Sequence, residues 1–196
     1  LFSRMNAALN IQFRHEEDDK IDFNLQRTLP HKFTQAGPGL AVGDFNNDGL
    51  DDFIIGGSTG YAPYVYTQRS DGTFVGIKKQ ARDENKKEED EGLLLFDADG
   101  DGDSDLYVVS GSIESQDKEV FQDRLYLNSG RGNFLLSAGS LPETTASGSC
   151  VRAADFDGDG DNDMISGIWS GVIIYFKNDG TPATPVFNPS TAPFTN

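Results

Sequence analysis

Short apolar runs recur along the chain in three sets that can be laid over one another. The runs are 39–42, 92–96 and 150–154; then 53–55, 106–109 and 164–168; then 64–66, 125–127 and 173–176. Glycine turns after the third set lead to Phe74, Phe134 and Phe187. The runs are rich in Val, Ile, Phe and Tyr and are bounded by Gly, Pro, Asn or Asp, which is typical of β-strands. Each repeat therefore predicts four strands, and no segment predicts a helix.

A nine-residue Asp-rich stretch joins the first and second run of every repeat, at 44–52, 97–105 and 155–163. Oxygen-bearing side chains stand at positions 1, 3, 5 and 9 of each stretch, and Gly49, Gly102 and Gly160 stand at position 6. Such side chains converge on one point when the chain curls around it, and glycine allows the sharp turn. The spacing therefore predicts a cation-binding loop in each repeat.

The candidate ligands occupy positions 1, 3, 5, 7 and 9, and position 7 acts through its backbone carbonyl. They are Asp44, Asn46, Asp48, Leu50 and Asp52 in the first loop, Asp97, Asp99, Asp101, Asp103 and Asp105 in the second, and Asp155, Asp157, Asp159, Asp161 and Asp163 in the third. An EF-hand loop also needs an acid at position 12, where this chain has Ile55, Val108 and Ser166. The loops are therefore not EF-hands, and the Asp at position 9 is expected to be the last ligand.

All-oxygen ligation by a flexible loop favours Ca²⁺ over Mg²⁺, which requires tighter octahedral geometry. One Ca²⁺ ion is expected in each of the three loops. The first loop has Asn46 where the others have Asp99 and Asp157, so it offers one negative charge fewer and is predicted to bind most weakly.

The net charge of −16 is concentrated in these loops. They hold fourteen Asp and no Lys or Arg, which leaves −2 for the rest of the chain. Clustered carboxylates repel one another unless a cation lies among them. The acidic balance disfavours a nucleic-acid partner, because such affinity comes largely from Lys and Arg. No stretch approaches the roughly 18 apolar residues of a membrane span.

Other segments are expected to support this repeat. The alternation of apolar and polar residues at 11–14 and 21–25 predicts two half-buried strands, and the charged segment 15–20 predicts a turn between them. The charge-dense insertions 78–91 and 112–123 are interpreted as solvated loops. The single cysteine, Cys150, forms no intrachain disulfide and is expected to be buried in a strand.

The loop starts lie 53 and 58 residues apart, a spacing typical of propeller blades or solenoid units. The pattern Asp-x-(Asp/Asn)-x-Asp-Gly-x-x-Asp, followed by Gly-Gly or Ser-Gly, resembles the FG-GAP and VCBS repeats of Ca²⁺-binding β-propellers such as integrin α-chain heads. Segments 29–44, 123–128 and 144–155 resemble the ASPIC/UnbV group, which includes cartilage-acidic-protein-like proteins. The resemblance covers about residues 10–180.

The resemblance implies an all-β chain of propeller blades. Residues 1–35 are expected as an N-terminal strand lead-in, 36–91 as the first blade, 92–148 as the second and 149–196 as the third. A closed propeller usually has four to eight blades. Three blades are therefore expected to form a partial propeller, or to close by self-association through exposed strand edges.

The resemblance also implies a secreted or cell-surface module that binds a protein or a carbohydrate, and no catalytic residue is predicted. The alternatives are a metal-dependent hydrolase or lyase acting on polysaccharide, and a purely structural spacer. His31 is interpreted as a loop residue. Tyr61, Tyr64, Tyr66 and Trp169 either line a glycan-stacking surface or pack within the strands.

Overall fold

The structure is a computed structural model that describes residues 5–18, 27, 37–78, 85–111, 117–181 and 184–190. The described residues form three four-stranded antiparallel sheets, one for each repeat, and the strands of each sheet are hydrogen-bonded in chain order. Apart from these strands, a short 3₁₀ helix spans Lys118–Phe121. None of the described helices is long and apolar enough to cross a membrane.

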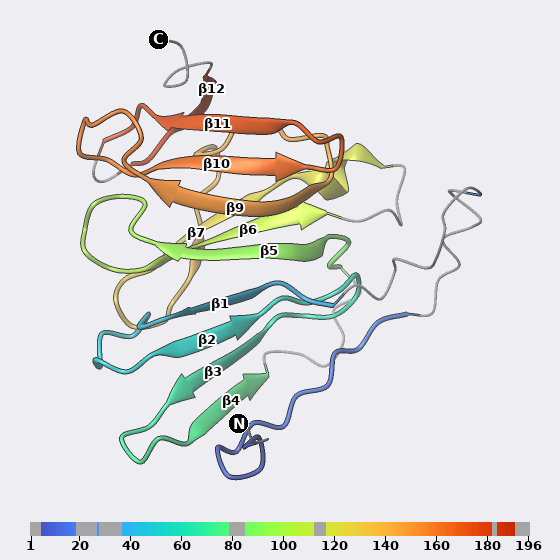
Figure 1. Cartoon of the computed structure of the whole chain (residues 1–196), viewed down its shortest axis with the longest axis vertical. Coiled ribbons are helices and arrows are strands. Elements are labelled where there is room, and N and C mark those ends of the chain that lie inside the picture. The colour runs from blue at the N-terminus through green and yellow to red at the C-terminus, as the bar shows by residue number, and fades with distance from the viewer. Residues whose placement is uncertain are drawn as a thin grey trace.

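The four strands predicted for each repeat are present. The first sheet contains β1 (Leu40–Gly43), β2 (Asp52–Ile55), β3 (Tyr64–Gln68) and β4 (Phe74–Lys78); the second contains β5 (Glu89–Phe96), β6 (Asp105–Gly111), β7 (Arg124–Leu127) and β8 (Leu135–Leu136); the third contains β9 (Gly148–Ala154), β10 (Asp163–Ile168), β11 (Ile173–Asn178) and β12 (Phe187–Ser190). Figure 1 shows the sheets one after another along the long axis, with β5 between β1 and β9. The all-β fold with blade-like sheets is therefore confirmed.

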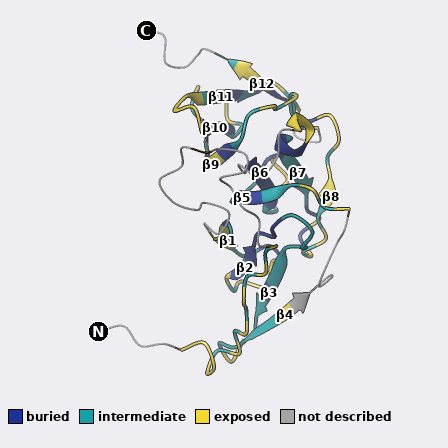
Figure 2. Cartoon of the chain, turned by 90° about the vertical axis from the view of Figure 1, so that its right-hand side faces the viewer, coloured by how far each residue is buried: buried dark blue, intermediate teal, exposed yellow. Residues whose placement is uncertain are grey.

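The second sheet is buried on both faces, because another sheet packs against each of them. On β6, Leu106 and Val108 belong to the core shared with the first sheet, whereas Tyr107 and Val109 belong to the core shared with the third. Successive side chains of a strand point to opposite faces. A continuous apolar run is therefore what β6 requires, and every residue of this strand is buried (Figure 2).

The N-terminal segment does not form the strand predicted at 11–14. It crosses the first sheet, where the Leu9 carbonyl accepts the Phe74 backbone N–H at 2.9 Å and the Glu16 carbonyl accepts the Ser58 hydroxyl at 2.6 Å. Phe13 packs edge-on against Tyr64, with ring centroids 5.3 Å apart. The period-2 pattern is explained by one side of the segment facing the sheet. Segment 15–18 contains no turn, and the strand predicted at 21–25 lies outside the described residues.

Interpreting the two charged insertions as solvated loops was wrong in their second halves. Residues 89–91 belong to β5, where Asp90 is buried. In the other insertion, Val120 and Phe121 of the 3₁₀ helix are buried together with Asp123. In both segments the fold buries a charged residue that finds partners, as Asp90 does with Arg124 and Asp123 with Tyr107.

Candidate metal centres

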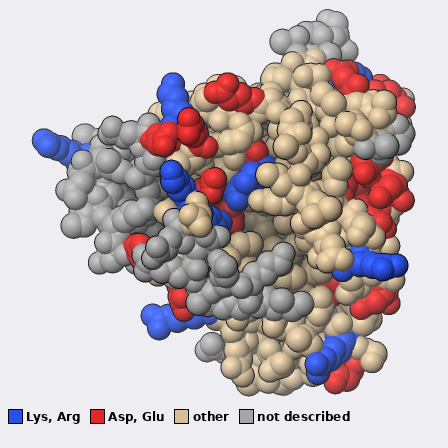
Figure 3. Space-filling model, turned by 180° about the vertical axis from the view of Figure 1, so that it is seen from behind, with Lys and Arg blue, Asp and Glu red and all other residues tan. Residues whose placement is uncertain are grey.

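The three Asp-rich loops lie along one edge of the molecule. Each loop joins the first and second strand of a sheet, and Figure 1 shows all three connections on the left-hand side. Seen from behind in Figure 3, acidic side chains gather along the opposite, right-hand edge of the view, which is this same edge. Hydrogen bonds join neighbouring loops: Asn47 donates to Asp103 at 2.5 Å, and Asn162 donates to the Asp97 carbonyl at 2.9 Å.

The carboxylate at position 1 organises the backbone of every loop. In the second loop, one oxygen of Asp97 accepts the Gly100 N–H at 2.7 Å and the other accepts the Gly102 N–H at 3.0 Å. Asp155 accepts the equivalent N–H groups of the third loop, and Asp44 does so in the first. These bonds curl the chain around the side-chain oxygens.

Positions 4 and 6 need a left-handed backbone. Position 6 is glycine in all loops, with φ of +83° at Gly49, +91° at Gly102 and +100° at Gly160. Position 4 is also left-handed, and there the first loop has Asn47 at φ +60°. Glycine and, less often, asparagine adopt this conformation at low cost. The sequence pattern thus reflects the conformation of the loop as well as its ligands.

The carboxylates at positions 1, 3 and 5 converge. In the second loop, Asp97, Asp99 and Asp101 offer oxygen atoms that all lie within 4.8 Å of one another, and the three equivalent Asp residues of the third loop do the same. Such acidic triads can hold a metal ion. The first loop has Asn46 at position 3, whose side-chain oxygen accepts the Asp48 N–H at 3.0 Å.

In the first two loops, the side chain at position 7 lies apart from the oxygens at positions 1, 3 and 5. The Asp103 carboxylate bonds Asn47 of the neighbouring loop at 2.5 Å, so it points away from its own triad. Leu50 has no side-chain oxygen. The predicted role of this position, a ligand through its backbone carbonyl, stays a prediction.

The carboxylate at position 9 ties each loop to the third strand of its sheet. Asp105 is fully buried, and its two oxygens accept the N–H groups of Asn128 and Ala98, both at 2.8 Å. Asp52 and Asp163, equally buried, accept the equivalent third-strand N–H groups at 2.7 Å and 2.8 Å. Whatever its role toward a metal, position 9 fixes the loop to its sheet.

In the second loop, burial and repulsion between carboxylates raise the pKa values of Asp105 and Asp99. Burial raises the pKa of Asp105 to about 6; the N–H groups of Asn128 and Ala98 oppose this shift, and the charges of Asp99 and Asp101 add to it. Burial followed by the charge of Asp101 likewise raises the pKa of Asp99. A bound cation would relieve this repulsion.

The carboxylates of the first and third loops also lie in surroundings that favour a positive charge. In the first loop, Asp52 Oδ2 is buried without a hydrogen-bond partner, and burial raises the pKa of this carboxyl. In the third loop, the Lys177 ammonium contacts both Asp157 and Asp159, so a positive charge already lies among these carboxylates. The first loop thus leaves a buried carboxylate oxygen that a cation could pair with, whereas the carboxylates of the third loop already gather a positive charge.

Sequence reasoning missed the asparagines that join neighbouring repeats. Asn128 Nδ2 donates to the carbonyl of Phe45, position 2 of the first loop, at 2.7 Å. Asn178 Nδ2 donates to the carbonyl of Ala98, position 2 of the second loop, at 3.3 Å. The only signal in the sequence was that an asparagine follows the third apolar run in both the second and the third repeat.

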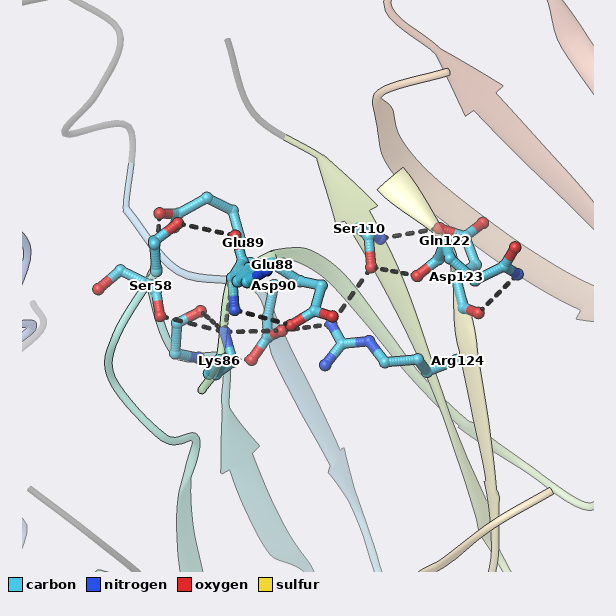
Figure 4. A network of polar contacts seen from close by, with 12 residues as sticks. Ser58, Lys86, Glu88, Glu89, Asp90, Ser110, Gln122, Asp123 and Arg124 are labelled. Carbon is cyan, nitrogen blue, oxygen red and sulfur yellow. Dashed lines mark hydrogen bonds and ion pairs between the residues drawn. The ribbon is translucent and has the colours of Figure 1, made fainter. Parts of the chain in front are cut away.

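A second charged cluster, also missed, lies at the opposite ends of the strands (Figure 4). Asp90 Oδ1 pairs with Lys86 at 3.2 Å and with Arg124 at 2.6 Å, and its other oxygen accepts the Gly57 N–H at 2.8 Å. Lys86 donates to three backbone carbonyls, and burial lowers its pKa. The cluster ties the first repeat to the second.

The other candidate side chains are distributed between core and surface. Tyr66 is buried and stacks on Phe53 with ring centroids 4.7 Å apart, so it packs within the sheet, whereas Trp169 is 74% exposed. Cys150 is exposed, contrary to expectation, because Val151 occupies the core side of β9. His31 lies outside the described residues.

The loop geometry agrees with the comparison with known families. Residues 44–108, and again 97–166, match the FG-GAP-like repeat, so the two matches together span more than half of the chain. The chain belongs to the FG-GAP-like repeat family. Each match begins at position 1 of a loop, which makes the Asp-rich loop the start of the FG-GAP-like unit. A comparison with curated proteins gives no match. The finer resemblance to the ASPIC/UnbV group stays a prediction.

Proposed function

We propose that this FG-GAP-like chain is a non-catalytic calcium-binding module that acts outside the cell or on its surface and recognises a protein or a carbohydrate. The observation that carries the calcium proposal is the convergence of three carboxylates within 4.8 Å in the second and third loops. The family resemblance supports the extracellular setting.

The residues that would hold the ion in the second loop are Asp97, Asp99, Asp101 and Asp105, together with the backbone carbonyl of Asp103. A carboxylate oxygen that accepts an N–H keeps a further lone pair, so the bonds within the loop do not exclude coordination. Only hard oxygen ligands are present, which favours Ca²⁺. The ion supplies charge neutralisation and a fixed loop conformation.

The role of calcium is proposed to be structural. The loops join strands within each sheet and bond to the loops of the next repeat, so fixing a loop also fixes the neighbouring sheet. An ion that binds only the folded chain stabilises it by about 2.7 kcal/mol when its concentration is one hundred times the dissociation constant.

The enzyme alternative is less well supported. A cavity of about 350 Å³ away from the loops is lined by Asp123 and Glu143 together with apolar residues such as Leu125. Both oxygens of Asp123 are already engaged, by the Tyr107 hydroxyl at 2.7 Å and the Ser110 N–H at 2.8 Å. This carboxylate therefore serves the fold, and incubation with polysaccharides is expected to release no new reducing ends.

Calorimetric titration of the metal-free chain tests the calcium proposal. We expect Ca²⁺ binding to several sites, with Mg²⁺ binding far more weakly. The double variant Asp99→Asn with Asp101→Asn should lose one site and keep its circular dichroism spectrum. The proposal is wrong if Ca²⁺ produces no saturable binding, or if the double variant binds like the parent chain.

A further inference from the structure

The third loop contains a cation supplied by the chain itself. Lys177, on β11, places its ammonium against Asp157 and at 2.8 Å from Asp159 Oδ2. These are positions 3 and 5, two of the three carboxylates that converge in this loop.

The second loop is a natural control for this contact. Its ligand positions carry Asp97, Asp99, Asp101, Asp103 and Asp105, and the third loop carries Asp at all five equivalent positions. The two loops also share the hydrogen bonds that position 1 makes to positions 4 and 6. Ligand type and loop conformation are therefore matched.

One difference lies on the third strand, at the residue before the one whose backbone N–H bonds to position 9. The N–H of Asn178 bonds to position 9 in the third repeat, and Asn128 and Gln68 do the same in the others. The residue before them is Lys177 in the third repeat, Leu127 in the second and Thr67 in the first. Of these three equivalent positions, only the third carries a charge.

We propose that Lys177 is a tethered cation that holds the third loop in its folded conformation without metal and competes with Ca²⁺ for that loop. Calcium must displace the ammonium from Asp157 and Asp159 before both carboxylates can turn to the ion. The third loop then fills at a higher Ca²⁺ concentration than the second, although their ligands are the same. This inference rests on the calcium binding proposed above.

The test compares Lys177→Met with Lys87→Met in calorimetric Ca²⁺ titrations. Lys87 is an exposed lysine away from the loops, and both substitutions lower the net charge by one. Lys177→Met should tighten one site by about five- to tenfold, the scale expected for removing two partly exposed ion pairs, while Lys87→Met should shift it less than twofold. In an Asp157→Asn, Asp159→Asn background, Lys177→Met should have no effect, which assigns the change to the third loop.

A second readout follows the lysine itself. Acylation by an amine-reactive ester, measured by mass spectrometry, should modify Lys177 slowly in chelator and several-fold faster in saturating Ca²⁺, whereas Lys87 should react equally in both. Calcium binding with equal affinity in the parent and Lys177→Met chains, or unchanged reactivity of Lys177, overturns the inference and leaves the proposed function standing. Failure of both chains to bind any Ca²⁺ overturns both.

Discussion

Replacing Asn128 by alanine removes one of the contacts that join the second repeat to the first at the loop edge. The side chain is buried and makes three hydrogen bonds: Nδ2 donates to the carbonyls of Phe45 at 2.7 Å and Ser104 at 3.0 Å, and Oδ1 accepts the Ser129 N–H at 2.9 Å. Each such bond contributes about 1 kcal/mol net. In the variant, the Phe45 carbonyl still accepts the Gly132 N–H at 3.0 Å, so it is not left without a hydrogen bond, and the loss of stability is smaller. The free energy of unfolding should therefore fall by about 2–3 kcal/mol.

Urea unfolding followed by circular dichroism in chelator measures this change without any contribution from metal. Gln68→Ala is the matched control. Gln68 is the last residue of β3, and Asn128 directly follows β7. The backbone N–H of Gln68 bonds to position 9 of the first loop, as that of Asn128 does in the second. No hydrogen bond to the Gln68 side chain occurs within the described residues, so this variant should lose less than about 0.5 kcal/mol. If Asn128→Ala costs no more than Gln68→Ala, the asparagine does not join the repeats as described.

Two further predictions concern a buried acid and a loop glycine. Burial raises the pKa of Asp123 to about 6 from 3.8, so the folded chain binds an extra proton between these values and the free energy of unfolding falls by about 3 kcal/mol as the pH rises through them. Asp123→Asn should remove this share of the pH dependence in urea unfolding from pH 4 to 7, while Asp105, whose pKa burial also raises to about 6, keeps a second share; an unchanged slope would refute the assignment. Gly102→Ala places a side chain at φ +91°, where about 1–2 kcal/mol of strain is expected, so its melting temperature in chelator should fall by several degrees. An unchanged melting temperature would show that the left-handed backbone is not required.

Much of the fold could be predicted from the sequence, because strand and loop signals are local. The run before Asp97 and the run after Asp105 are short and apolar, and the glycine at 102 stands where the backbone must be left-handed. Even the unbroken apolar run of β6 agrees with its position between two sheets. These features depend on residues close together in the chain.

The parts that were missed depend on residues far apart in the chain. Nothing near Asn128 indicates that its amide reaches Phe45, 83 residues earlier. Asp90 lies in a charge-rich run that resembles a solvated loop, and only the folded chain brings Arg124 against it. In the sequence, Lys177 is a polar residue in an apolar run, and nothing near it indicates the contacts with Asp157 and Asp159. Polar contacts between repeats therefore require the structure.

Thermal unfolding of the whole chain in Ca²⁺, in Mg²⁺ and in chelator tests the central claim most directly. At one hundred times its dissociation constant, Ca²⁺ adds about 2.7 kcal/mol for each occupied loop. For a domain of this size, that raises the melting temperature by about 5–10 °C per loop. We predict a rise of this size in Ca²⁺, little change in Mg²⁺ and reversal by chelator. The same melting temperature in all three conditions would contradict the claim that these loops are calcium sites that hold the sheets together.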